Sequence, residues 1–209
     1  MTPGPPVGIV LAGGRGRRLG GSKAKAIVAD RPLLHWPLAA LRAVLADVAV
    51  VAKRGGELPT LPADVALWVE PPAPQHPLAG IVHALRVADG RAVLVCAVDL
   101  PLVDADTVRR LVASRDGSSA VVAAADGRLQ PLLGVYEPAA LAALSRAPAD
   151  APLTDVVSAL APRIVAVSRE VLINVNRPND IAVAEAYLAS RGHGLERGPY
   201  GADQPKVNE

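Results

Sequence analysis

The sequence has very little of several residue types, and each scarcity excludes a class of protein. A single cysteine, Cys96, among 209 residues excludes an intramolecular disulfide and a cysteine-rich metal site. Aromatic residues make up only 2% and phenylalanine is missing, so the core must consist of valine, leucine, alanine and isoleucine. The formal net charge of +2 is too balanced to indicate a surface for nucleic acid or a membrane.

Long apolar runs and targeting segments are missing as well. No stretch reaches the ~18 apolar residues of a membrane span. Residues 1–6 lack the basic start and apolar stretch of a signal peptide. We therefore expect a cytoplasmic protein.

What the sequence does contain is a regular alternation of two kinds of segment. Helical spacing is expected over Pro32–Asp47, Leu78–Val87, residues 104–114, Pro138–Ser145, Pro152–Leu160 and Pro178–Ala189. Apolar strands are expected at Val7–Ala12, Val48–Ala52, Val65–Val69, Ala92–Val98, Ala120–Ala124, Leu129–Tyr136, Ile164–Val167 and Val171–Ile173.

This alternation predicts an α/β domain with a mostly parallel, Rossmann-like sheet covered by helices on both faces. The Asp126-Gly127 turn predicts a hairpin, which makes the sheet mixed. We expect residues 1–190 to form this single domain. Residues 191–209 are rich in glycine, proline and charge, so we expect a loose tail there.

A glycine-rich loop follows the first predicted strand. Gly13–Gly21 contains five glycines and three arginines, and such backbone can cradle phosphates. Two common phosphate motifs do not fit: Leu19 stands where a dinucleotide fingerprint has its third glycine, and Ser22 separates the last glycine from Lys23, so there is no P-loop. The alternative is a flexible, solvated loop.

Three charged residues are the main candidates for chemistry. Asp99 follows a wholly apolar strand, where a carboxylate needs a partner such as Mg²⁺ bound to nucleotide phosphates; otherwise it caps a turn. Lys23 ends the glycine loop and can neutralise a transferring phosphate, although Lys25 competes for that role. Arg18 is the arginine expected on the β- and γ-phosphates.

Two further segments have both a functional and a structural interpretation. Asn174 and Asn176 would point the same way at strand spacing and complete the metal or acceptor site, or they serve turn chemistry before Pro178. Gly80 lies at the start of a predicted helix, where the backbone can approach a base or ribose. Ordinary helix initiation explains the same pattern.

The motifs occur together in a recognisable order. They are LAGGRGRRLGGSK (residues 11–23), RPLL (Arg31–Leu34), PLAGI (Pro77–Ile81), VCAVDLP (Val95–Pro101) and INVNRPND (Ile173–Asp180). Over roughly residues 7–190 the chain resembles molybdenum cofactor guanylyltransferase, the MobA-type branch of the nucleotidyltransferases. The resemblance implies the nucleotide-diphospho-sugar transferase fold.

The resemblance also implies the reaction, which is Mg²⁺-dependent transfer of GMP from GTP to molybdopterin-bound molybdenum cofactor, with molybdoenzymes or cofactor-biosynthesis proteins as partners. Its implied site residues are Leu11, Ala12, Gly13 and Gly14 for the nucleotide, Lys23 for its phosphates and Asp99 for Mg²⁺. The favoured lysine is Lys23, because it lies nine residues before Pro32, as the family lysine does before its Pro-Leu.

The sequence departs from the family pattern at four positions. The family usually has Asp, Asn, Asp and Gly where this chain has Ser22, Lys53, Glu70 and His76. Glu70 keeps a carboxylate available for the nucleotide. Three alternatives therefore stay open: a cytidylyl or sugar-phosphate transferase with the same loop, a P-loop kinase, and a nucleotide-binding regulator without turnover.

Overall fold

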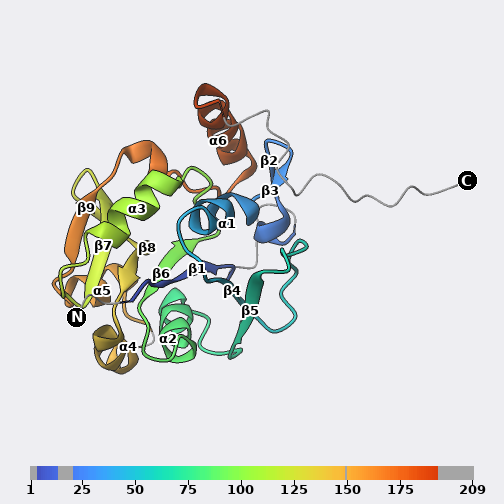
Figure 1. The fold of residues 1–209 in the computed structure, drawn as a ribbon. Coiled ribbons are helices and arrows are strands. Elements are labelled where there is room, and N and C mark those ends of the chain that lie inside the picture. Colours follow the sequence, from blue (N-terminus) through green and yellow to red (C-terminus); the bar gives the residue numbers. More distant parts are fainter. Residues whose placement is uncertain (1–3, 14–20, 149, 193–209) are drawn as a thin grey trace, which may run out of the picture.

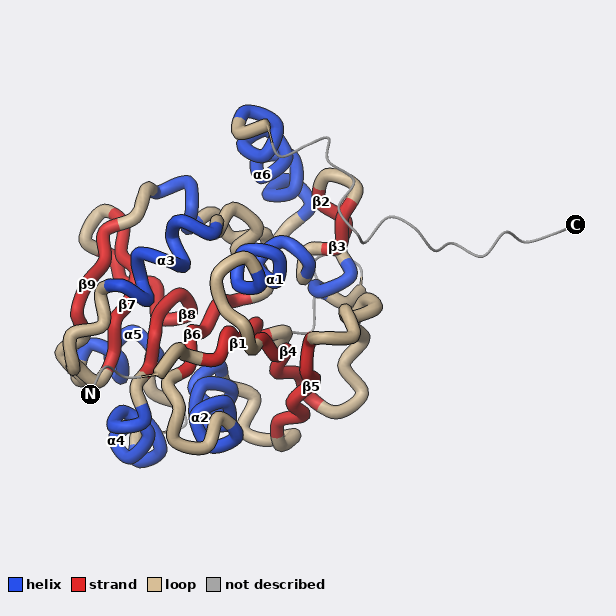
Figure 2. The backbone as a smooth tube through the Cα atoms, in the orientation of Figure 1, coloured by secondary structure: helices blue, strands red, loops and turns tan. Residues whose placement is uncertain are grey.

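The aliphatic segments predicted as strands form one seven-stranded sheet, shown in Figures 1 and 2. The computed structural model describes residues 4–13, 21–148 and 150–192. The strands lie in the order β5 (Val65–Glu70), β4 (Val48–Lys53), β1 (Val7–Leu11), β6 (Val93–Ala97), β8 (Arg128–Tyr136), β7 (Ala120–Ala125) and β9 (Arg163–Ala166). Of these, only β8 runs antiparallel to its neighbours, which confirms the mixed, mostly parallel sheet.

Helices cover both faces of this sheet (Figure 1). On one face, α1 (His35–Arg42) and α3 (Ala105–Ala113) pack with side chains of β1, β4 and β6 into one aliphatic cluster. On the other face, α2 (Pro77–Val87), α4 (Leu141–Arg146) and α5 (Leu153–Ser158) form a second cluster. The three layers confirm the predicted fold class.

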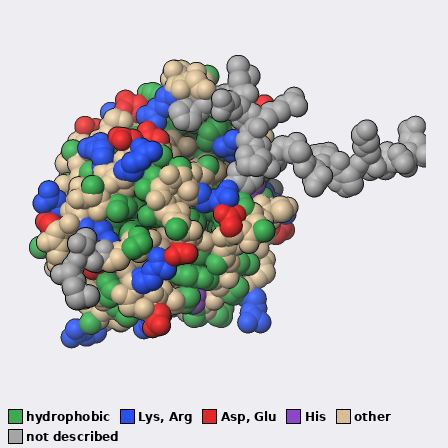
Figure 3. Space-filling model, viewed as in Figure 1, with side chains coloured by type: hydrophobic (Ala, Val, Ile, Leu, Met, Phe, Trp, Pro, Cys, Tyr) green, Lys and Arg blue, Asp and Glu red, His purple; other side chains and the backbone are tan. Residues whose placement is uncertain are grey.

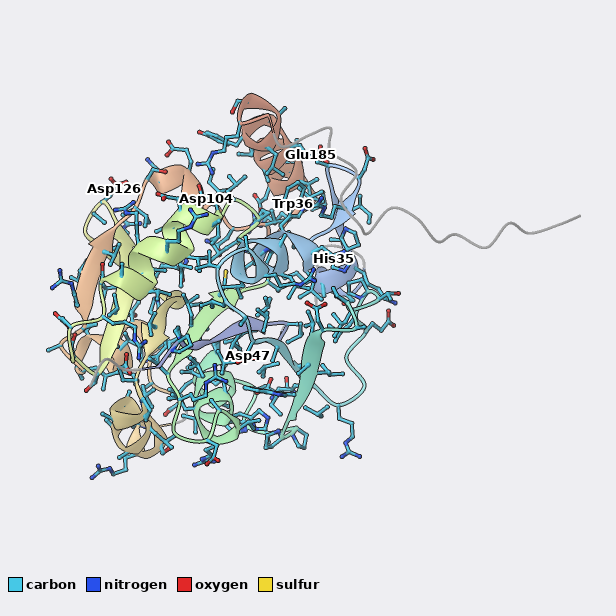
Figure 4. The ribbon with its side chains drawn as sticks, in the orientation of Figure 1. His35, Trp36, Asp47, Asp104, Asp126 and Glu185 are labelled. Atoms are coloured by element: carbon cyan, nitrogen blue, oxygen red, sulfur yellow. The ribbon has the colours of Figure 1, made fainter. Side chains whose placement is uncertain are left out.

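A third, smaller cluster holds a hairpin beside the last helix. The short strands β2 (Ile27–Val28) and β3 (Arg31–Pro32) pair antiparallel, and α6 (Pro178–Ser190) packs against them. The Trp36 indole N–H donates to the Val28 carbonyl at 3.0 Å, and the Ala29 amide donates to Glu185 of α6 at 2.8 Å. Figure 4 labels Trp36 and Glu185 beside this hairpin.

Several predicted element boundaries are wrong for identifiable reasons. Val171–Ile173 is no strand, because residues 169–172 form a 3₁₀ helix that buries Val171. The helix expected from Pro32 begins only at His35, since Pro32 pairs in the hairpin, and it ends at Arg42. The hairpin itself gave no sequence signal, because its strands have two residues each and its turn uses Ala29 and Asp30 at positive φ without glycine.

The parallel strands end together at one edge of the sheet. Leu11 at the end of β1 is in register with Val51 of β4 and Ala97 of β6, and Lys53 is in register with Glu70 at the ends of β4 and β5. The chain moves from β1 outward to β4 and β5 and then returns to β6 on the other side of β1. Such a reversal opens a crevice beyond the carboxyl ends of the strands.

Two further observations concern the helices and the C-terminal end of the described chain. Within the described ranges, no helix is both long and apolar enough to cross a lipid bilayer. Of the tail expected at 191–209, only Arg191 and Gly192 are described, and the Arg191 guanidinium donates to the Leu102 carbonyl at 3.1 Å.

Candidate functional site

Lys23, Asp99 and Asn176 meet at the carboxyl edge of the sheet. The Lys23 ammonium donates to Asp99 Oδ2 at 2.7 Å and to Asn176 Oδ1 at 2.6 Å. The Lys23 and Asp99 side chains are only 13% and 17% exposed. Residues from three distant parts of the sequence thus form one compact polar cluster in a partly desolvated position.

The backbone around this cluster explains how each side chain is held. Lys23 opens a 3₁₀ turn whose Ala24 is buried in the core and accepts a hydrogen bond from the Leu34 amide. Asp99 follows β6, and its carbonyl accepts from the Val175 amide at 2.9 Å. That bond places the segment carrying Asn176 directly over the end of β6.

Lys25, the competing lysine, lies elsewhere. Its ammonium forms an exposed ion pair with Glu57 at 3.1 Å, and the Ser22 hydroxyl donates to the carbonyl of the same glutamate at 2.5 Å. The structure therefore brings Lys23, and not Lys25, to Asp99. Ser22 and Lys25 instead tie the end of the glycine loop to the connection between β4 and β5.

One oxygen of the Asp99 carboxylate contacts Lys23, and the other is buried. Asp99 Oδ1 has no hydrogen-bond partner among the described residues. An unpaired, buried carboxylate oxygen is costly, and a hard cation such as Mg²⁺ is a fitting partner for it. No group of three acidic, histidine or cysteine residues that could hold a metal occurs among the residues described. The remaining ligands of such an ion would therefore come from phosphates and water.

A second cluster of candidate site residues lies where β1 and β5 end, and it consists of Glu70, Gly13 and Gly80. The Glu70 side chain is 6% exposed. A side-chain carbon added to Gly13 would lie 3.7 Å from Glu70 Oε1, and one added to Gly80 would lie 3.7 Å from Oε2 and 3.1 Å from Leu11 Cδ2. The carboxylate thus faces glycine backbone on two sides. Glu70 Oε2 is buried and has no hydrogen-bond partner among the described residues.

Two residues where the chain departs from the family pattern have clear positions next to this group. The Lys53 ammonium lies 3.3 Å from Glu70 Oε1. His76 precedes α2, and its Nδ1 accepts from the Leu78 amide at 3.3 Å, which caps the helix. His83, about two turns further into α2, has its pKa lowered by burial, an effect that the nearby Glu70 carboxylate opposes.

The other predicted site residues are less directly placed. Ala12 is half-buried and donates its amide to the Val51 carbonyl at 2.9 Å, beside the buried Leu11. The Asn174 amide donates to the Leu172 carbonyl at 2.9 Å and so does not join Asn176 at Lys23. The segment that carries the two asparagines is not a strand, and their side chains have different partners. Gly14 and Arg18 lie outside the described residues.

Sequence reasoning treated Lys53 only as a departure from a pattern and did not assign it a contact. A signal was present, because Lys53 and Glu70 both end predicted strands that neighbour each other in the chain. Their pairing depends on the strand register, which the sequence does not specify. Charge elsewhere is evenly spread: Figure 3 shows basic and acidic side chains interspersed over the face in view.

The fold and the polar groups at its carboxyl edge define a class of nucleotide-binding α/β proteins. A crystal structure of molybdopterin-guanine dinucleotide biosynthesis protein A from Archaeoglobus fulgidus superposes with a TM-score of 0.69 at 22% identity, over 88% of this chain and 99% of that one. A 2-C-methyl-D-erythritol 4-phosphate cytidylyltransferase from Thermus thermophilus superposes with a TM-score of 0.64 at 24% identity, over 88% of this chain and 99% of that one. Both have the nucleotidyltransferase fold.

Sequence comparison is more specific than the fold. The family model described as the MobA-like NTP transferase domain matches residues 8–165. A molybdenum cofactor guanylyltransferase from Cereibacter sphaeroides is 34% identical over 87% of this chain and 96% of its own length. The chain belongs to the family of MobA-like nucleotidyltransferases.

Proposed function

We propose that this protein transfers GMP from GTP to molybdopterin-bound molybdenum cofactor and releases pyrophosphate, with Mg²⁺ bound at Asp99. The observation that carries the proposal is the cluster in which Lys23 joins Asp99 while a second, buried oxygen of Asp99 stays available. The kinship with molybdenum cofactor guanylyltransferases supports this choice of donor and acceptor.

The proposed step needs no protein nucleophile. An oxygen of the terminal phosphate of the acceptor attacks the α-phosphorus of GTP. The bond between that phosphorus and the oxygen bridging to the β-phosphate breaks, and this oxygen leaves with the electron pair as part of pyrophosphate. Catalysis then consists mainly of alignment and charge stabilisation.

Lys23 is suited to charge stabilisation because an ammonium has three N–H donors. Two of them are used by Asp99 and Asn176. The third is available for a phosphate oxygen, and the other two fix the direction in which it points. Such a preorganised charge in a partly desolvated site strengthens its interaction with a developing negative charge.

Asp99 would hold Mg²⁺ through its free oxygen. When bound, the ion supplies additional positive charge for the triphosphate. The residues of the chain retain their own tasks: Asp99 Oδ2 keeps Lys23 in place, and the backbone at Gly13 leaves space for the phosphates.

Glu70 is the group that best fits a guanine base. Its carboxylate can only accept hydrogen bonds when ionised. Guanine presents two adjacent donors, N1–H and the N2 amine, whereas cytosine presents a single amine beside an acceptor. Gly13 and Gly80 lie against this carboxylate without side chains, and its buried Oε2 has no hydrogen-bond partner among the described residues, which supports placing the base here.

The test is pyrophosphate release from each of the four nucleoside triphosphates with Mg²⁺, with and without molybdenum cofactor. We expect release with GTP only when the cofactor is present. Asp99→Asn should lower this rate about 100-fold or more because it removes the charge that binds the ion. Thermal unfolding should stay within a few degrees of wild type.

A matched control is Asp126→Asn, since Asp126 lies exposed in the turn between β7 and β8, where its ion partner is Arg169 and not a group of the site, at a positive φ that asparagine tolerates. It should keep wild-type activity. If the protein prefers CTP, the donor in the proposed reaction is CTP and not GTP. GTP binding without pyrophosphate release would indicate a regulator, and full activity of Asp99→Asn would contradict the metal assignment.

A further inference from the structure

We infer that Lys53 is a positioning residue that sets the preference for guanine by holding Glu70 and the turn after it. This inference rests on the proposed function, because it assumes that the base lies against Glu70. It concerns a residue of this chain that lies beside the base site and that neither the proposed chemistry nor the phosphate cluster uses.

The Lys53 ammonium makes one ion pair and two hydrogen bonds. Nζ lies 3.3 Å from Glu70 Oε1, donates to the Pro71 carbonyl at 3.0 Å and donates to the Pro74 carbonyl at 3.3 Å. The strand register places the two side chains together, since Lys53 and Glu70 are partners at the ends of β4 and β5. Lys53 therefore contacts Glu70 and the turn after it at three points.

The first consequence concerns the charge of Glu70. Glu70 is only 6% exposed, and a buried carboxylate is costly unless it is paired with an opposite charge. Lys53 supplies that charge to Oε1 only, so Oε2 stays free as an acceptor for the base. Without the ammonium, Glu70 would lose the contact that fixes its orientation, and Oε2 would no longer be held towards Gly80.

The second consequence concerns the turn between β5 and α2. Residues 71–75 are exposed, and a hollow of about 210 Å³ lies against Pro71, Pro74 and the outer side of α2. Packing alone thus holds this turn weakly. Because the turn connects Glu70 to the helix that carries Gly80, its position sets how Gly80 lies against the carboxylate.

The experiment compares GTP with ITP, which lacks the N2 amine, in the wild type and in Lys53→Met. In the wild type we expect kcat/KM to favour GTP by about tenfold or more, since ITP loses one hydrogen bond to a charged acceptor. In Lys53→Met we expect KM for GTP to rise about tenfold, the preference for GTP over ITP to fall towards one, and kcat to change less than about threefold.

Two other variants serve as controls. Lys53→Arg keeps a charge and several donors and should retain most of the preference for GTP. Lys25→Met removes another lysine from an ion pair, that with Glu57, and should leave the preference unchanged. If Lys53→Met unfolds at the assay temperature, Lys53→Gln takes its place in the same comparison.

The outcomes separate this inference from the proposed function. An unchanged preference for GTP in Lys53→Met, or an equal loss with both nucleotides, would overturn the role of Lys53, because a purely structural effect weakens both alike. If the wild type releases no pyrophosphate, the proposed reaction fails, and calorimetric binding of GTP and ITP to the same variants then decides the inference. Equal binding of GTP and ITP by the wild type would overturn it as well.

Discussion

At the residue scale, the site depends on a lysine whose direction is fixed by its neighbours. Lys23 is a flexible side chain, and an unrestrained ammonium would spend much of its time in other rotamers. Asp99 supplies charge and Asn176 supplies a second, neutral acceptor. Asn174 lies two residues away in the sequence but donates to the Leu172 carbonyl. The two asparagines therefore have different tasks.

This difference predicts unequal effects of two matched substitutions. Asn176→Ala should lower kcat/KM for pyrophosphate release about tenfold, because it removes a hydrogen bond to a charged group that orients Lys23. Asn174→Ala should lower it by no more than about threefold. Steady-state kinetics of both variants with GTP and cofactor provide the measurement, and a larger loss for Asn174→Ala would show that Asn176 does not position Lys23.

At the element scale, the antiparallel strand β8 connects the half of the sheet that contains β1 and β6 to its other edge. It pairs with β6 on one side and with β7 on the other, and the β7 register shifts between Val122 and Ala123. Gly134 lies opposite this irregularity. A side-chain carbon added there would lie 2.6 Å from the Val121 carbonyl oxygen and 3.2 Å from Val122 Cα. The close approach of the two backbones requires glycine.

Gly134→Ala should therefore destabilise the fold without touching the site. We expect the free energy of unfolding in urea to fall by about 1–3 kcal/mol, as for other overpacked core positions. Gly4→Ala is the control, because nothing lies within 4 Å of the added carbon there. Its unfolding free energy should stay within about 0.5 kcal/mol of wild type. Equal stability of the two variants would mean that the strands separate at little cost.

At the scale of the whole molecule, two histidines couple stability to pH. Burial lowers the pKa of His35, which a hydrogen bond to the Thr60 carbonyl partly opposes, and burial also lowers the pKa of His83. The ordinary pKa of a histidine side chain is 6.5. The unfolded chain then binds more protons than the folded chain below that pH. Stability from these groups is present above about pH 6.5 and is lost as the pH falls through their lowered folded values.

We therefore expect the urea concentration at the midpoint of unfolding to be lower at pH 5.5 than at pH 7.5. His83→Gln should show a smaller fall than the wild type, because one of the two groups that resist protonation is removed. Urea titrations at the two pH values, with the variant and the wild type side by side, are the measurement. A midpoint that is equal or higher at pH 5.5 would contradict this coupling.

The sequence by itself determined the class of fold and the edge at which the site lies. A continuously apolar strand such as Val93–Ala97 buries all its side chains only in a sheet that is covered on both faces. Parallel strands in such a sheet place their carboxyl ends at the same edge. The positions of Asp99 and of Gly13 at that edge follow from local pattern alone. The short hairpin of β2 and β3 escaped detection, because two-residue strands have no periodicity.

Only the tertiary structure decided which polar groups meet. That Lys23 rather than Lys25 reaches Asp99, that Asn176 rather than Asn174 joins them, and that Lys53 lies against Glu70 all depend on strand register and on backbone bonds between distant segments. The secondary-structure preference of a residue carries no information about which distant residue it will contact. The chain therefore determines its layers through burial and periodicity, while the pairing of its charged residues arises only when the layers are packed together.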